Sequence, residues 1–327
     1  MDLKGKKVVV TGGAGFIGSH LCEELVKIGA EVVSFDNYAA GKEVNIEFLR
    51  DYKNFSAVKK DVCDTDAQMD EIFDGVDTIF HNAASKKNVC LIDPKKDLKV
   101  NGEGTFNMLT YAMKHNVRKF VHASTGSVYG EPTVFPSTED HPLRPVSYYG
   151  CSKLAGERYV DIFHHLYGLN TTILRYFHVY GPRQESNEFG GVVSIFFRNL
   201  MEGKDLVVFG DGKQIRTFTY VKDLVRANIA AATSEKAVGQ VYNAASGIKV
   251  TINELAENLI KLMHMEGRVK VVHGDPLVGD IMYFDVSNAK IRADLGINFE
   301  QDFWGTMKKT TDEFQVYLDK ILAAAKR

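Results

Sequence analysis

The fold of this chain is decided by residues 7–18, which run Lys-Val-Val-Val-Thr-Gly-Gly-Ala-Gly-Phe-Ile-Gly. An apolar run of strand length enters a glycine-rich turn, and an amphipathic helical pattern follows over residues 16–28. Gly12 permits a tight turn, Gly15 lets the backbone approach a pyrophosphate, and Gly18 lets helix and strand pack closely. Unpaired N–H groups and the helix dipole favour phosphates at the helix N-terminus. We therefore expect a dinucleotide site formed by Gly12, Gly15, Phe16, Ile17 and Gly18.

Similar strands alternate with helical patterns through the first half of the chain. Their continuous Val, Ile and Phe runs suit burial on both faces of a sheet. They lie at residues 7–11, 31–36, 77–81, 119–124 and 170–176, with helical patterns between them at 65–74, 95–115 and 149–168. This alternation predicts an α/β fold, a Rossmann-type doubly wound parallel sheet with its cofactor site at the carboxyl ends of the strands.

The regular alternation of strands and helices ends after residue 181, where glycines such as those at 203, 210 and 212 separate shorter elements. Residues 181–327 are therefore expected to form a smaller C-terminal lobe, interleaved with the first domain at residues 1–180. No Ser/Gly-rich linker separates the two domains, and the sequence contains no internal repeat. The tail from about residue 303 has the pattern of a surface helix.

Composition excludes several classes of protein. The 327 residues suit about two folding units, and 45% hydrophobic with 25% charged residues is a globular balance. A net charge of −2 provides no field for nucleic acid or an anionic membrane. No apolar stretch is long enough to span a membrane, and the apolar run at residues 8–10 is too short for a signal peptide.

The cysteines and histidines suggest neither disulfides nor a metal. The four cysteines are scattered without a CxxC pair, which indicates reduced thiols in a cytoplasmic protein. No Cys/His cluster has the spacing of metal ligands, so no metal is expected.

Acidic residues at the end of the second strand and before the strand at 77–81 point to a particular dinucleotide. A carboxylate at Asp36 can accept hydrogen bonds from the adenosine ribose hydroxyls and would repel a 2′-phosphate, which favours NAD over NADP. Asn37 could assist. Asp61 and Val62 are expected to contact the adenine, although Asp61 could instead be a helix N-cap.

A second group of residues has the side chains needed for proton transfer. Tyr149 and Lys153 are four residues apart, so on a helix they share one face. We expect the ammonium to lower the pKa of the phenol toward neutrality. Thr125 follows Ser124 at the end of a strand and adds a hydroxyl at the same edge of the sheet. Asn101 lies on the intervening helix.

Together these motifs resemble the extended short-chain dehydrogenase/reductases, in particular the nucleotide-sugar epimerases and dehydratases. The resemblance covers nearly the whole chain and is specific for family and fold, much less so for substrate. It rests on residues 11–18, 36–37, 61, 81–84, 101, 124–130, 149–153, 174–183 and 210–223.

This resemblance implies an NAD-dependent enzyme with a nucleotide-sugar substrate, bound mainly by the second lobe. Tyr149 would take the proton of the sugar 4-hydroxyl, Thr125 would hydrogen-bond the same oxygen, and Lys153 would tune Tyr149 and hold the cofactor. Hydride transfer from C4 to NAD would give a 4-keto sugar, and return to the opposite face would be 4-epimerisation. Further cofactor contacts are implied for Ala83, Ala84, Asn101 and Tyr176.

The resemblance also implies substrate contacts and a partner. Arg216 corresponds to a phosphate-binding arginine, whose guanidinium suits a diphosphate. Asp280 lies near the nucleotide diphosphate and ribose, and Val208 flanks the base. Relatives form a homodimer through the helices predicted at 95–115 and 149–168.

Departures from the family pattern leave alternatives open. The 4,6-dehydratases have Asp-Glu after the catalytic threonine, where this chain has Gly126 and Ser127, which are poor proton-transfer groups. Lys86 and His178 replace residues beside the sugar and are expected to bind substrate. Leu277 takes the place of a second phosphate-binding arginine, which leaves the base open. A 4,6-dehydratase, a C4 dehydrogenase, a uronate decarboxylase and a catalytically idle NAD-binding protein remain alternatives to a 4-epimerase.

Overall fold

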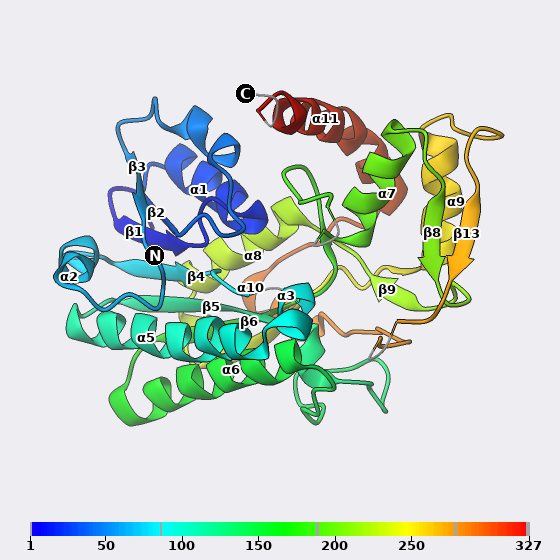
Figure 1. Ribbon diagram of the computed structural model, residues 1–327. Helices are drawn as coiled ribbons and strands as arrows, with labels where there is room; N and C mark the ends of the chain where they lie inside the picture. Colours follow the sequence, from blue (N-terminus) through cyan, green and yellow to red (C-terminus); the bar gives the residue numbers. More distant parts are fainter. Residues whose placement is uncertain (1, 86, 188–189, 278–279, 325–327) are drawn as a thin grey trace.

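A parallel sheet of seven strands forms the centre of the molecule, in the order β11-β6-β5-β4-β1-β2-β3 (Figure 1). The structure, a computed structural model, describes residues 2–85, 87–187, 190–277 and 280–324. The order reverses between β1 and β4, which places a ligand crevice at the carboxyl ends of these strands. The strands are β1 (Lys7–Thr11), β2 (Glu31–Asp36), β3 (Phe55–Lys59), β4 (Thr78–His81), β5 (Lys119–Thr125), β6 (Thr171–Tyr176) and β11 (Gln240–Ala244).

Helices cover both faces of this sheet (Figure 1). On β1, Val8 and Val10 pack toward one group of helices and Val9 toward the other. Both faces are thus buried, which explains the continuous apolar runs of the strands. The first group is α1 (Phe16–Lys27), α8 (Val221–Thr233) and α10 (Ala289–Leu295), and the second is α2 (Ala67–Phe73), α5 (Gly104–Lys114) and α6 (Tyr148–Tyr167).

The second lobe has its own apolar core, which includes Phe196, Phe197 and Phe314. Its helices are α7 (Val192–Met201), α9 (Ile252–Leu262) and α11 (Phe303–Ala324). Three two-stranded sheets complete it: β8 (Leu206–Phe209) with β13 (Val271–Gly274), β9 (Ile215–Thr217) with β12 (Lys249–Thr251), and β7 (Val179–Tyr180) with β10 (Thr219–Tyr220).

Short helices fill the connections. Of these, α3 (Lys87–Ile92), α4 (Pro94–Leu98) and the π-helical turn η3 (Lys99–Glu103) lead into α5. The 3₁₀ turns are η1 (Glu43–Asn45), η2 (Glu47–Leu49), η4 (Gly126–Tyr129) and η5 (Glu235–Ala237).

The doubly wound parallel sheet predicted from the sequence is confirmed, as are its five predicted strands. The helix predicted at 95–115 is the succession of α4, η3 and α5. The sequence predicts interleaved lobes but not which elements return to the first lobe. These elements are α8, which packs on the sheet, and β11, which completes it. The end of α8 is rich in alanine, whose small side chains give a weak helical pattern. Within the described residues, no helix has the length and apolar character needed to cross a membrane.

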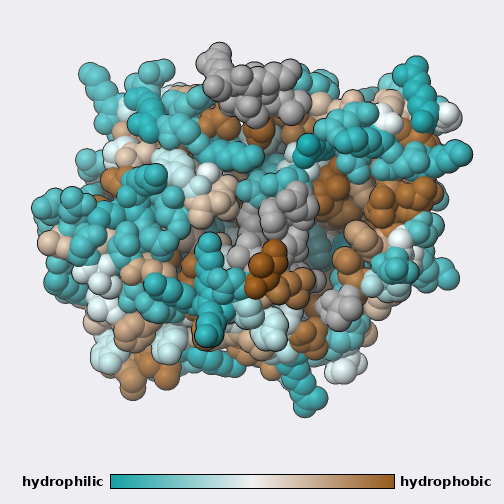
Figure 2. Space-filling view, in the orientation of Figure 1, coloured by the Kyte–Doolittle hydropathy of each residue, from teal (hydrophilic) through white to brown (hydrophobic). Residues whose placement is uncertain are grey.

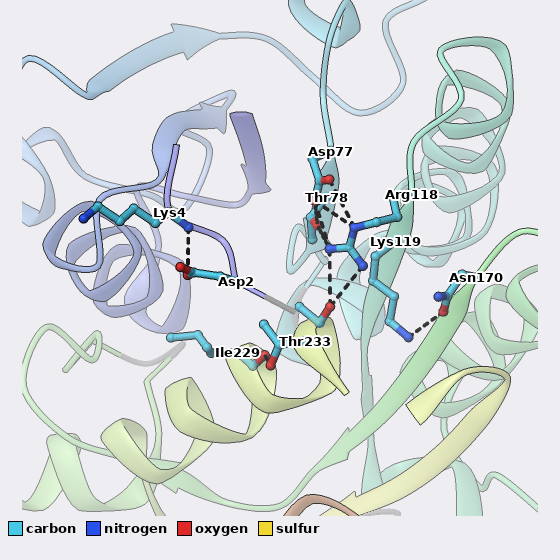
Figure 3. Close-up of polar contacts among 10 residues, drawn as sticks. Asp2, Lys4, Asp77, Thr78, Arg118, Lys119, Asn170, Ile229 and Thr233 are labelled. Carbon is cyan, nitrogen blue, oxygen red and sulfur yellow. Dashed lines mark hydrogen bonds and ion pairs between the residues drawn. The ribbon is translucent and has the colours of Figure 1, made fainter. Parts of the chain in front are cut away.

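Polar contacts hold the amino ends of the strands together, at the edge of the sheet opposite the crevice (Figure 3). The guanidinium of Arg118 donates to the carboxylate of Asp77 at 2.9 Å and to the hydroxyl of Thr78 at 3.1 Å. Lys119 donates to the side-chain oxygen of Asn170 at 2.7 Å, and its burial, together with Arg118, lowers its pKa to about 7. These contacts join β4, β5 and the start of β6.

Candidate active site

The turn between β1 and α1 has the geometry that its glycines predict. Gly12 has a φ of +68°, in the left-handed region that favours glycine. A Cβ on Gly18 would lie 2.1 Å from the carbonyl oxygen of Gly12, so the turn tolerates no side chain there. Gly15 is the N-cap of α1 and lines the cleft, which leaves the helix N-terminus open to an anion.

Asp36 ends β2 beside this turn. Its carboxylate accepts hydrogen bonds from the backbone N–H groups of Ala14 (3.0 Å) and Tyr38 (2.8 Å). Burial raises the pKa of this carboxyl, the two backbone hydrogen bonds oppose the rise, and Asp61 adds to it. Each carboxylate oxygen has one such donor and keeps a lone pair for a ligand hydroxyl. The side chain of Asn37 donates to Asp61 at 2.6 Å.

A cleft of about 720 Å³ runs from the glycine turn to α6. Its length, the open helix N-terminus and the buried carboxylate of Asp36 fit an extended dinucleotide. All of the predicted cofactor residues except Asn101 line it: Gly12, Gly15, Phe16, Ile17, Gly18, Asp36, Asn37, Asp61, Val62, Ala83, Ala84, Tyr149, Lys153 and Tyr176.

Helix α6 brings the predicted catalytic side chains to the end of this cleft. Its N-cap, Ser147, accepts a hydrogen bond from the Gly150 N–H at 3.1 Å, and Tyr149 lies in the first turn. One turn later, the buried ammonium of Lys153 donates to the carbonyl oxygen of Ala123 on β5 at 2.6 Å. Thr125 ends β5 and lies near enough to the phenol of Tyr149 to lower its pKa. The three predicted residues therefore meet at the carboxyl edge of the sheet.

The pKa of Tyr149 differs from the prediction. Burial raises the pKa of Tyr149 to about 12, the hydroxyl of Thr125 lowers it in part, and the carboxylate of Asp97 adds to the rise. Burial also lowers the pKa of Lys153 to about 8, against the opposing charges of Glu157 and Asp97. The expectation that Lys153 lowers the Tyr149 pKa is therefore wrong for the protein groups by themselves, because desolvation of the phenolate dominates.

Asn101 lies behind the cleft wall and not in it. It belongs to the π-helical turn η3 and is fully buried. Its side-chain oxygen accepts from the Ser85 N–H at 2.9 Å, and its amide nitrogen donates to Asp97 (3.1 Å) and Ser152 (3.0 Å). The structure thus does not bring Asn101 to the predicted cofactor contact, because its amide is committed to joining the segment after β4 to α4 and α6.

A buried ion pair that sequence reasoning missed supports the end of β5. Arg175 donates to both carboxylate oxygens of Glu157, at 3.0 and 2.8 Å, and to the hydroxyl of Tyr129 at 2.7 Å. Glu157 also accepts from the hydroxyl of Ser124 at 2.5 Å, so the proton of this hydroxyl is committed to Glu157 although Ser124 lines the cleft. The available signal was two opposite charges, one in a buried strand and one on the predicted helix at 149–168, because buried charges are normally paired.

A smaller pocket of about 170 Å³ continues from the cleft past Tyr176 and His178. Thr125 and Asp280 line it, on opposite lobes. His178 has a φ of +33° and packs edge-on against Phe284, with ring centroids 4.9 Å apart. The predicted substrate residues Thr125, His178 and Asp280 are therefore brought together beside Tyr149.

The other predicted substrate residues have mixed positions. Arg216 is paired with Asp280 at 2.7 Å and donates to the carbonyl of Ile281 at 2.7 Å, next to the smaller pocket but not in its lining. Val208 is fully buried in the core of the second lobe, so its side chain does not face a ligand. Lys86 lies outside the described residues.

The residues on either side of Val208 lie on the exposed face of β8. Val207 and Phe209 alternate with it along β8 and are 42% and 43% exposed, and Val272 of β13 is 38% exposed on the same sheet. Figure 2 shows this region as hydrophobic surface over β8 and β13.

Gly126 follows Thr125 at the floor of the smaller pocket. A Cβ on Gly126 would lie 2.2 Å from Cε1 of Phe177. Phe177 is itself held among aromatic rings, with centroids 6.3 Å from Tyr129 and 6.1 Å from Phe284. A side chain at position 126 therefore has no space. In the part of the chain that the structure describes, no group of three or more His, Cys, Asp or Glu residues is placed to hold a metal ion.

The model of the NAD dependent epimerase/dehydratase family matches residues 8–245. The chain belongs to this family. It is therefore an NAD-dependent nucleotide-sugar enzyme of the extended short-chain dehydrogenase/reductase type, as the resemblance implied.

Three relatives indicate the range of activities. UDP-glucose 4-epimerase of Mycolicibacterium smegmatis is 34% identical over 294 residues, 89% of this chain and 92% of that protein. UDP-N-acetyl-alpha-D-glucosaminuronate decarboxylase of Bacillus cytotoxicus is 39% identical over 281 residues, 82% of this chain and 83% of that protein. The structure of UDP-N-acetylglucosamine 4-epimerase from Methanobrevibacter ruminantium, in complex with UDP-N-acetylmuramic acid, matches with a TM-score of 0.89 and 32% identity, covering 96% of this chain and 99% of that one.

Proposed function

We propose that this chain is a 4-epimerase of UDP-linked sugars that acts through a transient 4-keto sugar. The observation that carries the proposal is the pairing of Gly126 with Phe177 beside an intact Thr125, Tyr149 and Lys153. Elimination of water across C5 and C6 needs an additional acid or base near the sugar. A side chain at position 126 is excluded by the 2.2 Å approach to Phe177, and the next residue is Ser127. The site therefore favours reversible transfer at C4 without further chemistry.

In this proposal Tyr149, Thr125 and Lys153 each have a separate role in the reaction at C4 of the sugar. Tyr149 accepts the proton of the 4-hydroxyl, and Thr125 hydrogen-bonds the same oxygen. Lys153 supplies positive charge one turn away on α6, which stabilises the phenolate, and it holds the cofactor ribose. When bound in the cleft, NAD would supply the hydride acceptor and donor for C4. Lys153 is buried and Tyr149 and Thr125 are half-buried, so a bound sugar that covers them would exclude water and retain the keto sugar until hydride returns to its other face.

The second lobe is proposed to hold the nucleotide. Arg216 is the phosphate ligand, and Asp280, its partner at 2.7 Å, holds it in position and contacts the ribose. The exposed side chains of Val207 and Phe209 provide an apolar surface for the base. His178 and Lys86 are proposed to contact the sugar. We choose UDP because the three relatives named above act on or bind UDP-sugars.

A panel of UDP-, GDP-, dTDP- and CDP-sugars tests the function. The purified protein with NAD is expected to convert a UDP-sugar into an isomer of equal mass, detected by NMR of the anomeric proton. Tyr149→Phe is the inactive control. Loss of water would indicate a dehydratase, and loss of carbon dioxide a decarboxylase. Stable NADH with a 4-keto product would indicate a C4 dehydrogenase, and each of these results would overturn the proposal.

We also propose a homodimer formed through α5 and α6. Of the apolar residues on these helices, Leu109 and Phe163 are buried in the core, whereas Phe106, Ile162 and Leu166 are 43%, 48% and 67% exposed. Such a patch suits burial against a second copy. Light scattering at micromolar concentration should give the mass of a dimer, and Ile162→Glu should give a monomer. A monomeric wild type would contradict the proposal.

A cytoplasmic location is proposed as well, since none of the four cysteines is in a disulfide. Cell fractionation would test it.

A further inference from the structure

A buried carboxylate contacts Ser152, the residue before the predicted catalytic Lys153, and has no assigned role. Asp97, on α4, is fully buried. Its Oδ2 accepts from the hydroxyl of Ser152 at 2.5 Å, and its Oδ1 accepts from the amide of Asn101 at 3.1 Å. Ser152 is the residue before Lys153, so this contact fastens α4 to the catalytic turn of α6.

The charges around Lys153 give this carboxylate a partner. The two buried acids whose charges favour the Lys153 ammonium are Glu157 and Asp97. Glu157 is neutralised by its two-pronged ion pair with Arg175. Asp97 forms no ion pair among the described residues, and neither does Lys153, whose ammonium donates to the carbonyl of Ala123. Among these buried groups, Asp97 is therefore the acid without an ion-pair partner, and Lys153 is the base without one.

The cost of burying a charge links Asp97 to Lys153. An isolated charge in a buried site costs several kcal/mol, and a nearby opposite charge offsets part of that cost even without direct contact.

We propose that Asp97 is a positioning residue, the buried counter-charge that keeps Lys153 protonated and holds Ser152 between Tyr149 and Lys153. The inference rests on the proposed function for the roles of Tyr149 and Lys153, whereas the coupling of Asp97 to Lys153 stands apart from any activity.

The other titratable groups near Asp97 and Lys153 do not supply the negative charge that keeps Lys153 protonated. The imidazoles of His81 on β4 and His122 on β5 are fully buried, and burial together with Lys153 lowers the pKa of both, to about 3 for His81, so they stay neutral above pH 6. The groups that face the pair are Tyr149 and Glu157 on α6, Cys90 on α3, His81 on β4, His122 on β5 and, behind Glu157, Arg175 on β6.

One variant separates the charge from the hydrogen bonds. In Asp97→Asn, the amide oxygen can still accept from Asn101. The new amide nitrogen can donate to Ser152, whose hydroxyl turns to the carbonyl of Tyr149, already 3.1 Å away. All contacts are kept while the charge is lost. Asp93→Asn is the matched control, because Asp93 is an exposed carboxylate at the N-cap of the same helix and asparagine is an equally good cap.

The experiment is a titration of Lys153 by NMR in protein labelled with ¹³C at lysine Cε, with the resonance assigned by its absence in Lys153→Ala. Removing the negative charge disfavours the ammonium, so Asp97→Asn should lower the Lys153 pKa by about 1 unit, the effect of one buried charge a few ångströms beyond contact. Asp93→Asn should leave it unchanged. An unchanged Lys153 titration in Asp97→Asn overturns the proposal.

Turnover gives the second readout. If the proposed epimerase activity is present, both limbs of its pH profile should move to lower pH in Asp97→Asn, since the same charge also raises the Tyr149 pKa. A structural role alone would lower the plateau and leave the limbs in place, which also counts against the proposal. A wild-type protein that epimerises no sugar would overturn the proposed function, while the lysine titration would still decide the role of Asp97.

A double variant covers the case in which Asp97→Asn does not fold. Lys153→Met with Asp97→Asn removes both charges together, so it should fold and unfold at a higher urea concentration than either single variant. A double variant damaged by the sum of the two single effects overturns the coupling.

Discussion

The ring of Phe177 occupies the space beside Gly126, 2.2 Å from where a Cβ would be. Because Phe177 is packed between Tyr129 and Phe284, it cannot move away without opening the aromatic cluster around it. Position 126 is therefore a glycine for steric reasons, and the absence of an acid there is built into the pocket.

Gly126→Ala is expected to destabilise the protein by about 1–3 kcal/mol, the usual cost of forcing an extra methyl group into a packed core. Urea denaturation with and without NAD measures it. Gly102→Ala is the control, since its Cβ would be in ordinary contact, 3.4 Å from Cδ1 of Leu98, in a helical segment where alanine is favoured over glycine. Equal stability of Gly126→Ala and wild type would show that the ring yields, and would weaken the argument against a dehydratase.

The ion pair of Glu23 with Arg183 predicts a pH dependence of stability. Burial favours the neutral form of Glu23, but hydrogen bonds and charges from Lys27 and Arg183 outweigh it and lower the pKa from 4.5 to about 2. A lowered pKa in the folded state stabilises the protein above pH 4.5, and this contribution disappears as the pH falls toward 2. Glu23→Gln should cost about 1 kcal/mol at pH 7, after allowance for solvent screening.

The measurement is thermal or urea unfolding of both proteins between pH 7 and pH 2. The difference in free energy of unfolding should narrow as the acid range is entered. Glu31→Gln removes an exposed carboxylate at the start of β2 and should show a small, constant difference. A gap between Glu23→Gln and wild type that stays constant down to pH 2 would mean that the pair contributes no charge-dependent stability.

Asp36 is expected to select NAD. Asp36→Ala should weaken NAD binding by about 10²-fold, since hydrogen bonds to a charged group are each worth about 1.5–3 kcal/mol, and should reduce the discrimination against NADP. Gly41→Ala offers an independent approach, because its Cβ would lie 2.7 Å from the Asp36 carboxylate and displace it without removing the charge. Calorimetric titration with both dinucleotides gives the result. Tighter binding of NADP than NAD by the wild type would refute the assignment.

The features predicted correctly from sequence are those that depend on local geometry. A glycine is needed at position 12 for its positive φ and at position 18 for the close approach of helix and strand, and both needs are visible in a short motif. The spacing of Tyr149 and Lys153 fixes a shared helix face in the same way. Residues 8–10 are apolar on both faces, so burial in a parallel sheet follows from the pattern alone.

The errors arise where long-range packing decides. Asn101 lies in a π-helical turn, and its amide is used by Ser85, Asp97 and Ser152, which the spacing of the motif does not encode. On β8 the run Leu-Val-Val-Phe is apolar throughout, so the sequence could not tell that Val208 faces the core while its neighbours are exposed. The pKa of Tyr149 depends on how deeply the fold buries it, which no local pattern reports.

The sharpest prediction concerns the catalytic trio. Tyr149→Phe should abolish C4 hydride transfer and leave NAD binding nearly intact, because the phenol oxygen moves the proton but contributes little to holding the dinucleotide. Lys153→Ala should impair both, since it removes the ammonium at the end of the cleft. Thr125→Ala should lose about 10²-fold in turnover, the typical cost of one hydrogen-bond donor in the transition state.

Stopped-flow absorbance of NADH with a matched sugar nucleotide reports hydride transfer, and calorimetry reports NAD binding. Tyr148→Phe is the matched control, because Tyr148 is the preceding residue of the same helix and is 59% exposed, so it should keep wild-type rates. The order of the effects matters more than their size: turnover lost with the cofactor kept for Tyr149, both impaired for Lys153, and partial loss for Thr125. Reduction of NAD at the full rate by Tyr149→Phe would remove that residue from the mechanism and leave only the assignment of the nucleotide cleft standing.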